Sequence, residues 1–223
     1  MNMIAEELIN HMIPPLKPKD DAHKALVWME ELRSNELPVV NNEKFIGFIT
    51  EEMVMEQNDV EMLIEDFDTI GKNCVLSKNS HFYDVLKIAS ENFLQMVGVE
   101  DDEKNYLGVI TVRDTINSFA QSVAIQIPGS ILVLSLQQID YSLSQISRLI
   151  EENNAKILSS NVEVDDDDAS KLRVTLKIDK LDLSPIVATF ERFGFKVIGR
   201  FQESTMENQE KDRINMLLKF LDI

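Results

Sequence analysis

The sequence runs Leu37-Pro-Val-Val-Asn-Asn-Glu-Lys-Phe-Ile-Gly-Phe-Ile-Thr50 in its first quarter and Leu107-Gly-Val-Ile-Thr111 further along. In the first run, two apolar stretches flank the polar residues Asn-Asn-Glu-Lys, a pattern typical of two short strands joined by a turn. Gly47 and Gly108 lie 61 residues apart, and the threonines that close the two runs have the same spacing. The chain therefore contains an internal duplication.

The two copies also start alike, because Leu16 and Leu76 lie 60 residues apart. Each copy predicts a short extended start, an amphipathic helix, two short β-strands and a closing helix. Two copies are too few for a solenoid. They suit a pseudo-twofold pair in which each half covers the apolar sheet face that the other leaves bare. We expect one domain over residues 1–124, with copy one at about 1–66 and copy two at about 67–124.

A second domain is expected over residues 128–202, because Pro128-Gly129 ends a helix and starts a turn. The pattern that follows predicts a strand, a helix, two strands, a helix and a strand, which is the ferredoxin-like βαββαβ order. The fold class is therefore α/β. The expected elements are strand 131–136, helix 142–153, strands 155–164 and 172–178, a helix opened by Ser184-Pro185 and ended by Gly194, and strand 195–201.

One face of this second sheet has no predicted cover, since both helices pack on the other face. A helical extension over residues 203–223, with an apolar stripe from Ile214 to Leu221, is one candidate cover. A second subunit is the other. We expect a homodimer.

Composition excludes several classes of partner. The formal net charge of -17 opposes approach to nucleic-acid phosphates and to anionic lipids. No stretch approaches the length of a membrane span, and the N-terminus lacks the basic start and apolar run of a signal peptide. Cys74 is the single cysteine, so no internal disulfide can form. These features predict a cytoplasmic protein that binds neither nucleic acid nor membrane.

No pattern for catalysis or metal binding stands out. The chain has no G-x-x-x-x-G-K or G-x-G-x-x-G run, and nothing in it proposes a nucleophile with a base and an oxyanion donor. His11, His23 and His81 are scattered without ligand spacing. The acidic run Asp165–Asp168 lacks the spacing of a calcium loop and is interpreted as a solvated hairpin turn. We expect a protein that is not an enzyme and holds no metal.

Two motifs carry a resemblance to known families. The run from Leu37 to Thr50, together with Gly108-Val-Ile-Thr-Val-Arg-Asp114, resembles a tandem pair of CBS domains. The βαββαβ unit in this position resembles an ACT domain. The combination is similar to the acetoin-utilisation regulatory family of CBS-ACT proteins, and the resemblance covers nearly the whole chain.

The resemblance implies an adenine-nucleotide site with no required cofactor. By position, Thr111 would lie near phosphate, Asp114 would bind the ribose hydroxyls, and Arg113 would pair with phosphate. The ligand would be AMP, ADP, ATP or S-adenosylmethionine. The first copy has Met53 where the ribose-binding Asp should be, so we expect at most one site per chain.

A structural interpretation of the same residues stays open. Thr111-Val-Arg-Asp114 is also a variant of the capping box, in which Thr caps the helix and the acidic third residue answers it. The second domain differs from amino-acid-binding ACT domains, because its loop Gln137–Ser142 has no glycine. Dimerisation or partner contact is the role expected of that domain.

Three functions follow as hypotheses. The first is a regulatory sensor that binds an adenine nucleotide in the CBS pair and relays it to the ACT-like domain or a partner. The second is a ligand-free interaction or dimerisation module that regulates an enzyme or transporter. The third is an unrecognised hydrolase, which rests only on the cleft expected in such a module.

Overall fold

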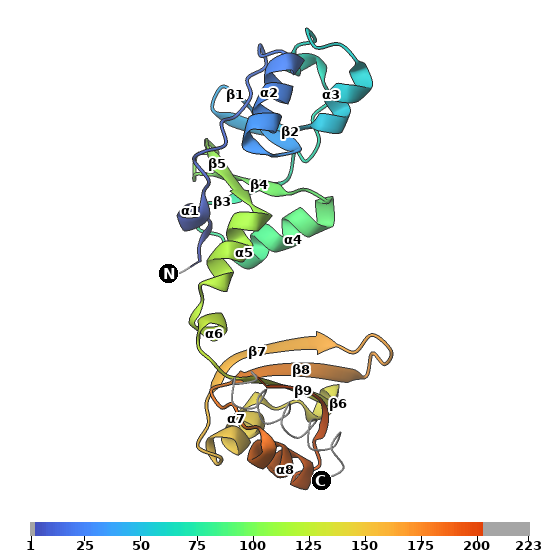
Figure 1. Cartoon of the computed structure of the whole chain (residues 1–223). Helices are drawn as coiled ribbons and strands as arrows, with labels where there is room; N and C mark the ends of the chain where they lie inside the picture. Colours follow the sequence, from blue (N-terminus) through green and yellow to red (C-terminus); the bar gives the residue numbers. More distant parts are fainter. Residues whose placement is uncertain (1–2, 203–223) are drawn as a thin grey trace, which may run out of the picture. The chain divides into compact units, whose positions relative to one another are not determined.

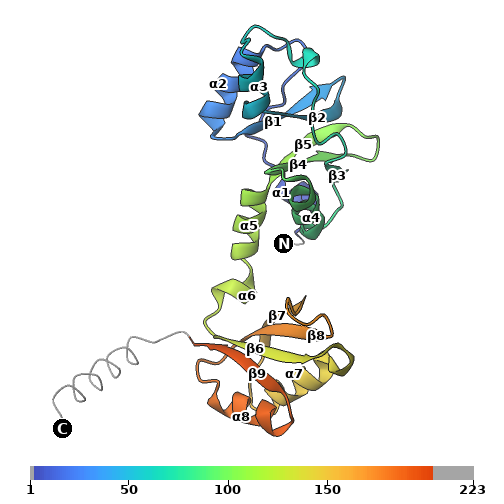
Figure 2. The same cartoon turned by 90° about the vertical axis from the view of Figure 1, so that its right-hand side faces the viewer.

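A computed structural model describes residues 3–202, and these form parts of two compact units, Met1–Ala120 and Gln121–Ile223. Figures 1 and 2 show the chain from two sides. The predicted helical extension over residues 203–223 lies outside the described residues. No helix within residues 3–202 is both long enough and apolar enough to cross a bilayer.

The N-terminal unit contains the predicted duplication. Copy one consists of α2 (Ala22–Leu32), β1 (Glu36–Asn41), β2 (Lys44–Thr50) and α3 (Glu51–Gln57). Copy two consists of β3 (Val75–Ser77), α4 (Phe82–Asn92), β4 (Met96–Glu100), β5 (Tyr106–Thr111) and α5 (Val112–Ala120). In both copies the last two strands are antiparallel, and the start of the copy pairs in parallel with the first of them: Leu16 with Val39, and Leu76 with Val99.

The segments that precede the two copies are exchanged between them. The first contains α1 (Ala5–Leu8) and packs on copy two, although it precedes copy one in the sequence. The second contains the 3-10 helix η1 (Ile64–Asp66) and packs on copy one. The division at about residue 66 that we inferred from the sequence therefore follows chain order and not packing. The bridges are Ile4–His81 and Asn10–Val109 on copy two, and Asp21–Leu63 and Phe48–Ile70 on copy one.

A shared apolar cluster joins the copies at their strands. Phe48 of β2 and Val109 of β5 are fully buried in it, beside Met96 and Cys74. Cys74 is 1% exposed, as expected for a small apolar residue, and burial raises the pKa of its thiol. Because this cluster draws on both copies, neither copy has a complete core alone.

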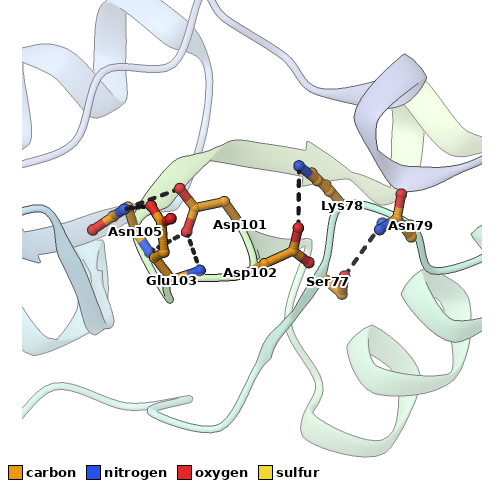
Figure 3. A network of polar contacts seen from close by, with 7 residues as sticks. All are labelled: Ser77, Lys78, Asn79, Asp101, Asp102, Glu103 and Asn105. Carbon is orange, nitrogen blue, oxygen red and sulfur yellow. Dashed lines mark hydrogen bonds and ion pairs between the residues drawn. The ribbon is translucent and has the colours of Figure 1, made fainter.

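The β4–β5 turn is held by a polar network (Figure 3). Oδ1 of Asp101 accepts hydrogen bonds from the backbone N–H groups of Glu103, at 2.9 Å, and Asn105, at 2.8 Å. The side chain of Asn105 also donates to Asp101, and these bonds lower the pKa of that carboxyl. From the hairpin of copy one, Lys44 donates to the Glu103 carbonyl and, at 3.0 Å, to Asn105 Oδ1, so the two hairpins meet.

The C-terminal unit has the predicted βαββαβ order. After α6 (Val123–Gln126) come β6 (Ser130–Gln137), η2 (Gln138–Asp140), α7 (Leu143–Glu151), β7 (Ile157–Val164), β8 (Lys171–Ile178), α8 (Ser184–Arg192) and β9 (Lys196–Phe201). The sheet order is β7-β8-β6-β9, and all neighbours are antiparallel. Both α7 and α8 cover one face of this sheet (Figure 1).

Strand β8 shows why the sheet has one covered face. Leu172, Val174, Leu176 and Ile178 are buried against the helices, whereas the alternate residues are only half-buried. The acidic run Asp165–Asp168 forms the loop between β7 and β8, as predicted. Asp168 pairs there with Lys171 at 2.7 Å, and this contact, aided by Ser170, lowers the pKa of Asp168 to about 2.

Candidate functional site

The start of α5 is held by a cap between Thr111 and Asp114. The Asp114 backbone N–H donates to Thr111 Oγ1 at 2.9 Å, and that hydroxyl donates to Asp114 Oδ2 at 2.7 Å. The capping interpretation of these residues is therefore realised in the structure. It fixes both side chains at the junction of β5 and α5.

Asn10 is a third member of this group, and sequence reasoning missed it. Its Nδ2 donates to Asp114 Oδ2 at 2.8 Å, while its Oδ1 accepts from the Met12 backbone N–H at 2.9 Å. The counterpart of Asn10 in the duplication is Ile70, so the repeat gave no signal for it. Oδ1 of Asp114 accepts no hydrogen bond from any residue between 3 and 202, and it is free to accept one from a ligand.

A cavity of about 390 Å³ lies beside the start of α5. Its volume is within the range of small-molecule sites. Both copies and the segment between α1 and copy one contribute to its wall. Thr111 and Arg113 line it, whereas Asp114 does not. The lining residues are Ile13, Arg33, Ser34, Gln95, Met96, Thr111, Val112, Arg113, Ile116 and Asn117.

Two arginines give the cavity a cationic side in a chain of net charge -17. Arg113 belongs to α5 of copy two, and Arg33 belongs to copy one, just after α2. Arg33 ends that helix in the left-handed conformation, with φ 53° and ψ 46°. Neither guanidinium forms an ion pair within residues 3–202. Both can therefore meet an anionic ligand with their donors unused.

Sequence reasoning missed Arg33 because it lies outside the duplicated motif. Its counterpart in copy two is Phe93, which also ends its helix in the left-handed region, with φ 56°. A charged residue at a helix end is ordinarily solvated, so no local signal assigns it to a cavity.

The equivalent position in copy one does not reproduce this chemistry. Thr50 caps α3, accepting from the Met53 backbone N–H at 3.3 Å. Met53 itself packs against the apolar core of copy one. Glu51 and Glu52 occupy the first turn of α3 and place negative charge there.

Larger hollows lie elsewhere in the described residues, but their walls do not bring two arginines together. One of about 690 Å³ in the N-terminal unit includes Lys17 and Lys19, and Lys19 is already paired with Glu65 at 2.5 Å. Another, of about 560 Å³, lies in the C-terminal unit beside the loop after β6, with Lys171 and Lys196 in its wall. A third, of about 610 Å³, lies in the same unit beside the start of β7. Within residues 3–202, no set of three His, Cys, Asp or Glu side chains is arranged to hold a metal ion.

Comparison with known proteins finds no matching family model. Over 112 residues, the chain is 30% identical to inosine-5'-monophosphate dehydrogenase of Methanocaldococcus jannaschii. That match covers 49% of this chain and only 22% of the length of the dehydrogenase.

Among solved structures, the chain resembles CBS domain pairs over about half its length. A CBS domain pair/ACT domain protein of Thermotoga maritima is 15% identical, with a TM-score of 0.49, over 53% of this chain and 98% of that one. CBSX2 in complex with AMP is 14% identical, with a TM-score of 0.46, over 53% of this chain and 96% of that one. The CBS domains of a transcriptional regulator of Streptococcus pneumoniae are 20% identical, with a TM-score of 0.47, over 51% of this chain and 97% of that one.

Proposed function

We propose that the N-terminal unit is a CBS domain pair that binds an adenine nucleotide or a related adenosyl ligand in the 390 Å³ cavity. The observation that carries the proposal is the meeting of Thr111 and Arg113 of copy two with Arg33 of copy one around one cavity. The 30% identity to inosine-5'-monophosphate dehydrogenase over 112 residues supports it from sequence.

The cavity wall has residues suited to the purine and to the phosphate of such a ligand. The apolar side chains of Ile13, Met96 and Ile116 suit the faces of a purine ring. The guanidinium groups of Arg33 and Arg113 suit the phosphate, since Arg pairs with phosphate through two parallel hydrogen bonds.

Thr111 and Asp114 have a second role in this proposal. Their mutual hydrogen bonds fix the start of α5, which positions Arg113 and Val112 in the wall. Oδ1 of Asp114 stays available for a ribose hydroxyl. Because Asp114 does not line the cavity, the ligand would have to extend beyond the lining residues to meet it. Capping and ligand contact are thus compatible roles of the same pair.

The protein acts in this proposal as a non-catalytic cytoplasmic regulator. Because the cavity wall includes both copies, a ligand there can bias how the copies pack, through its different affinity for two arrangements. We propose that the ACT-like C-terminal unit relays this change or mediates homodimerisation, and that the regulated partner is an enzyme or transporter.

A ligand-free interaction module is the second candidate. It is favoured by the complete cap at Thr111, which explains that residue and Asp114 without any ligand. Under this function the exposed Arg33 and Arg113 would contact an acidic partner surface.

Calorimetric titration with AMP, ADP, ATP and S-adenosylmethionine separates the two candidates. Saturable binding of one of them at a ratio of about one per chain would support the sensor. Failure of all four at millimolar concentration would favour the interaction module, and pull-down with purified candidate enzymes would then follow.

A further inference from the structure

Glu36 is a buried carboxylate that joins the two copies. It is the first residue of β1 and is only 4% exposed. Its Oε1 accepts two hydrogen bonds of 2.8 Å, from the backbone N–H groups of Gln95 and Met96 in copy two. No cation pairs with it within the described part of the chain.

Both partners of Glu36 belong to the cavity wall. The contact continues further, because the Gln95 carbonyl accepts from the Val112 backbone N–H at 2.8 Å. Val112 is the first residue of α5 and lies in the wall beside Arg113. A chain of hydrogen bonds thus leads from the carboxylate of copy one to the helix start that carries the candidate phosphate ligands.

The duplication shows which of these hydrogen bonds is specific to the cavity. In copy one the Glu51 backbone N–H donates to the Asn35 carbonyl at 2.8 Å, which repeats the Val112–Gln95 bond. The counterpart of Glu36 in copy two is Met96, 60 residues later, and a thioether cannot replace a carboxylate that accepts two N–H groups. The contact of a carboxylate in copy one with the wall in copy two therefore has no counterpart that runs from copy two to copy one.

We propose that Glu36 is a positioning residue, through which copy one fixes the Gln95–Met96 wall and the start of α5 for the ligand of the cavity. The inference rests on the proposed nucleotide site for its ligand, but the geometry of the wall can be measured without one. The two backbone N–H groups that donate to Glu36 Oε1 form charge-assisted hydrogen bonds when this carboxyl is ionised.

The test compares Glu36→Met, which installs the side chain of the other copy, with Glu36→Gln, which keeps the shape and removes the charge. Glu100→Gln is the matched control, because within residues 3–202 this carboxylate at the end of β4 pairs only with Lys104 of its own copy. The ligand-free readout is amide hydrogen exchange of the full chain, measured by NMR at Gln95, Met96 and Val112. Glu51 supplies the internal reference, since its bond to Asn35 should not depend on Glu36.

We expect Glu36→Met to speed exchange at Val112 by about tenfold or more, with Glu51 unchanged, and Glu36→Gln to have a smaller effect of the same kind. Unchanged exchange at Val112 in both variants would overturn the inference. So would equal acceleration at Val112 and Glu51 in Glu36→Gln, because that pattern reports general loosening.

AMP titration of the same proteins separates this inference from the proposed function. If the wild-type protein binds AMP, we expect about tenfold weaker binding in Glu36→Met, an intermediate value in Glu36→Gln and no change in Glu100→Gln. Equal AMP affinity in all four proteins would contradict positioning. If the wild-type protein does not bind AMP, then AMP is not the ligand, and the exchange pattern alone decides whether Glu36 positions the wall.

Discussion

Asn10 and Asp114 stand 104 positions apart in the sequence and are joined by a hydrogen bond of 2.8 Å from Asn10 Nδ2 to Asp114 Oδ2. The contact exists because the segment before copy one packs on copy two. The exchanged segment therefore reaches the residues that the duplicated motif singles out.

Replacement of Asn10 tests this contact. Asn10→Ala removes a neutral donor from a half-buried carboxylate, and we expect the free energy of unfolding to fall by about 1 kcal/mol. Urea denaturation measures the change. Asn79→Ala is the control, because Asn79 is exposed and its hydrogen bond within residues 3–202 runs from its backbone N–H to Ser77 Oγ (Figure 3). A loss no larger than that of the control would show that the bond carries no stability.

The two capping threonines separate stability from ligand binding. Thr111→Val and Thr50→Val each remove one helix cap, so each should cost about 1 kcal/mol of unfolding free energy. Only Thr111 lines the cavity. We expect AMP affinity to fall about fivefold in Thr111→Val and to stay unchanged in Thr50→Val. Equal affinity losses in the two variants would place the ligand elsewhere.

Gly47 of β2 lies against the exchanged segment that contains Ile70. Gly47 has φ 135°, and a Cβ there would lie 2.7 Å from the Ile70 carbonyl oxygen. We expect Gly47→Ala to lower the free energy of unfolding by about 3 kcal/mol, through both strain and clash. At Gly194, φ is 82° with nothing within 4 Å of the added Cβ, so Gly194→Ala should cost about 1 kcal/mol. Thermal and urea unfolding measure both losses. A larger loss of unfolding free energy in Gly194→Ala than in Gly47→Ala would contradict this expectation.

The pH dependence of stability tests the burial of Glu36. Burial raises the pKa of its carboxyl above the ordinary value near 4.5, and the two backbone hydrogen bonds only partly offset this effect. A carboxyl with a raised folded-state pKa favours folding in its protonated form, so its contribution is full below pH 4.5 and is lost as pH rises through the raised pKa.

We therefore expect the stability of Glu36→Gln relative to wild type to increase as pH rises from about 4 to 7. Urea denaturation of both proteins at several pH values measures it. A difference that falls with rising pH would mean that the hydrogen bonds outweigh desolvation. In that case the pKa of Glu36 would lie below its ordinary value.

The duplication and the βαββαβ order could be predicted because both depend on local patterns. Gly47 and Gly108 repeat at a fixed spacing, and β8 alternates buried and half-buried residues along its length. The cap at Thr111 was predictable for the same reason, since its partner is three residues away.

The rest of the site depends on contacts between distant residues. Asn10 and Arg33 have no counterpart of their kind in the duplication, where Ile70 and Phe93 stand. Glu36 reads as an ordinary charged residue before a strand, and only the packing of one copy on the other places it against Gln95 and Met96. The exchange of the connecting segments produces no periodic pattern in the sequence. An assignment by chain order therefore placed α1 in copy one, whereas it packs on copy two.

The most direct test of the account is the dissociation constant of AMP for the wild-type protein, Arg33→Gln and Arg113→Gln, measured by calorimetry. Lys104→Gln is the control, as a cation paired with Glu100 outside the cavity lining. We expect saturable binding by wild type, about tenfold weaker binding in each arginine variant and no change in the control. Failure of the wild type to bind AMP, ADP, ATP or S-adenosylmethionine, or equal affinity of all four proteins for the ligand that binds, would contradict a nucleotide site between the two copies.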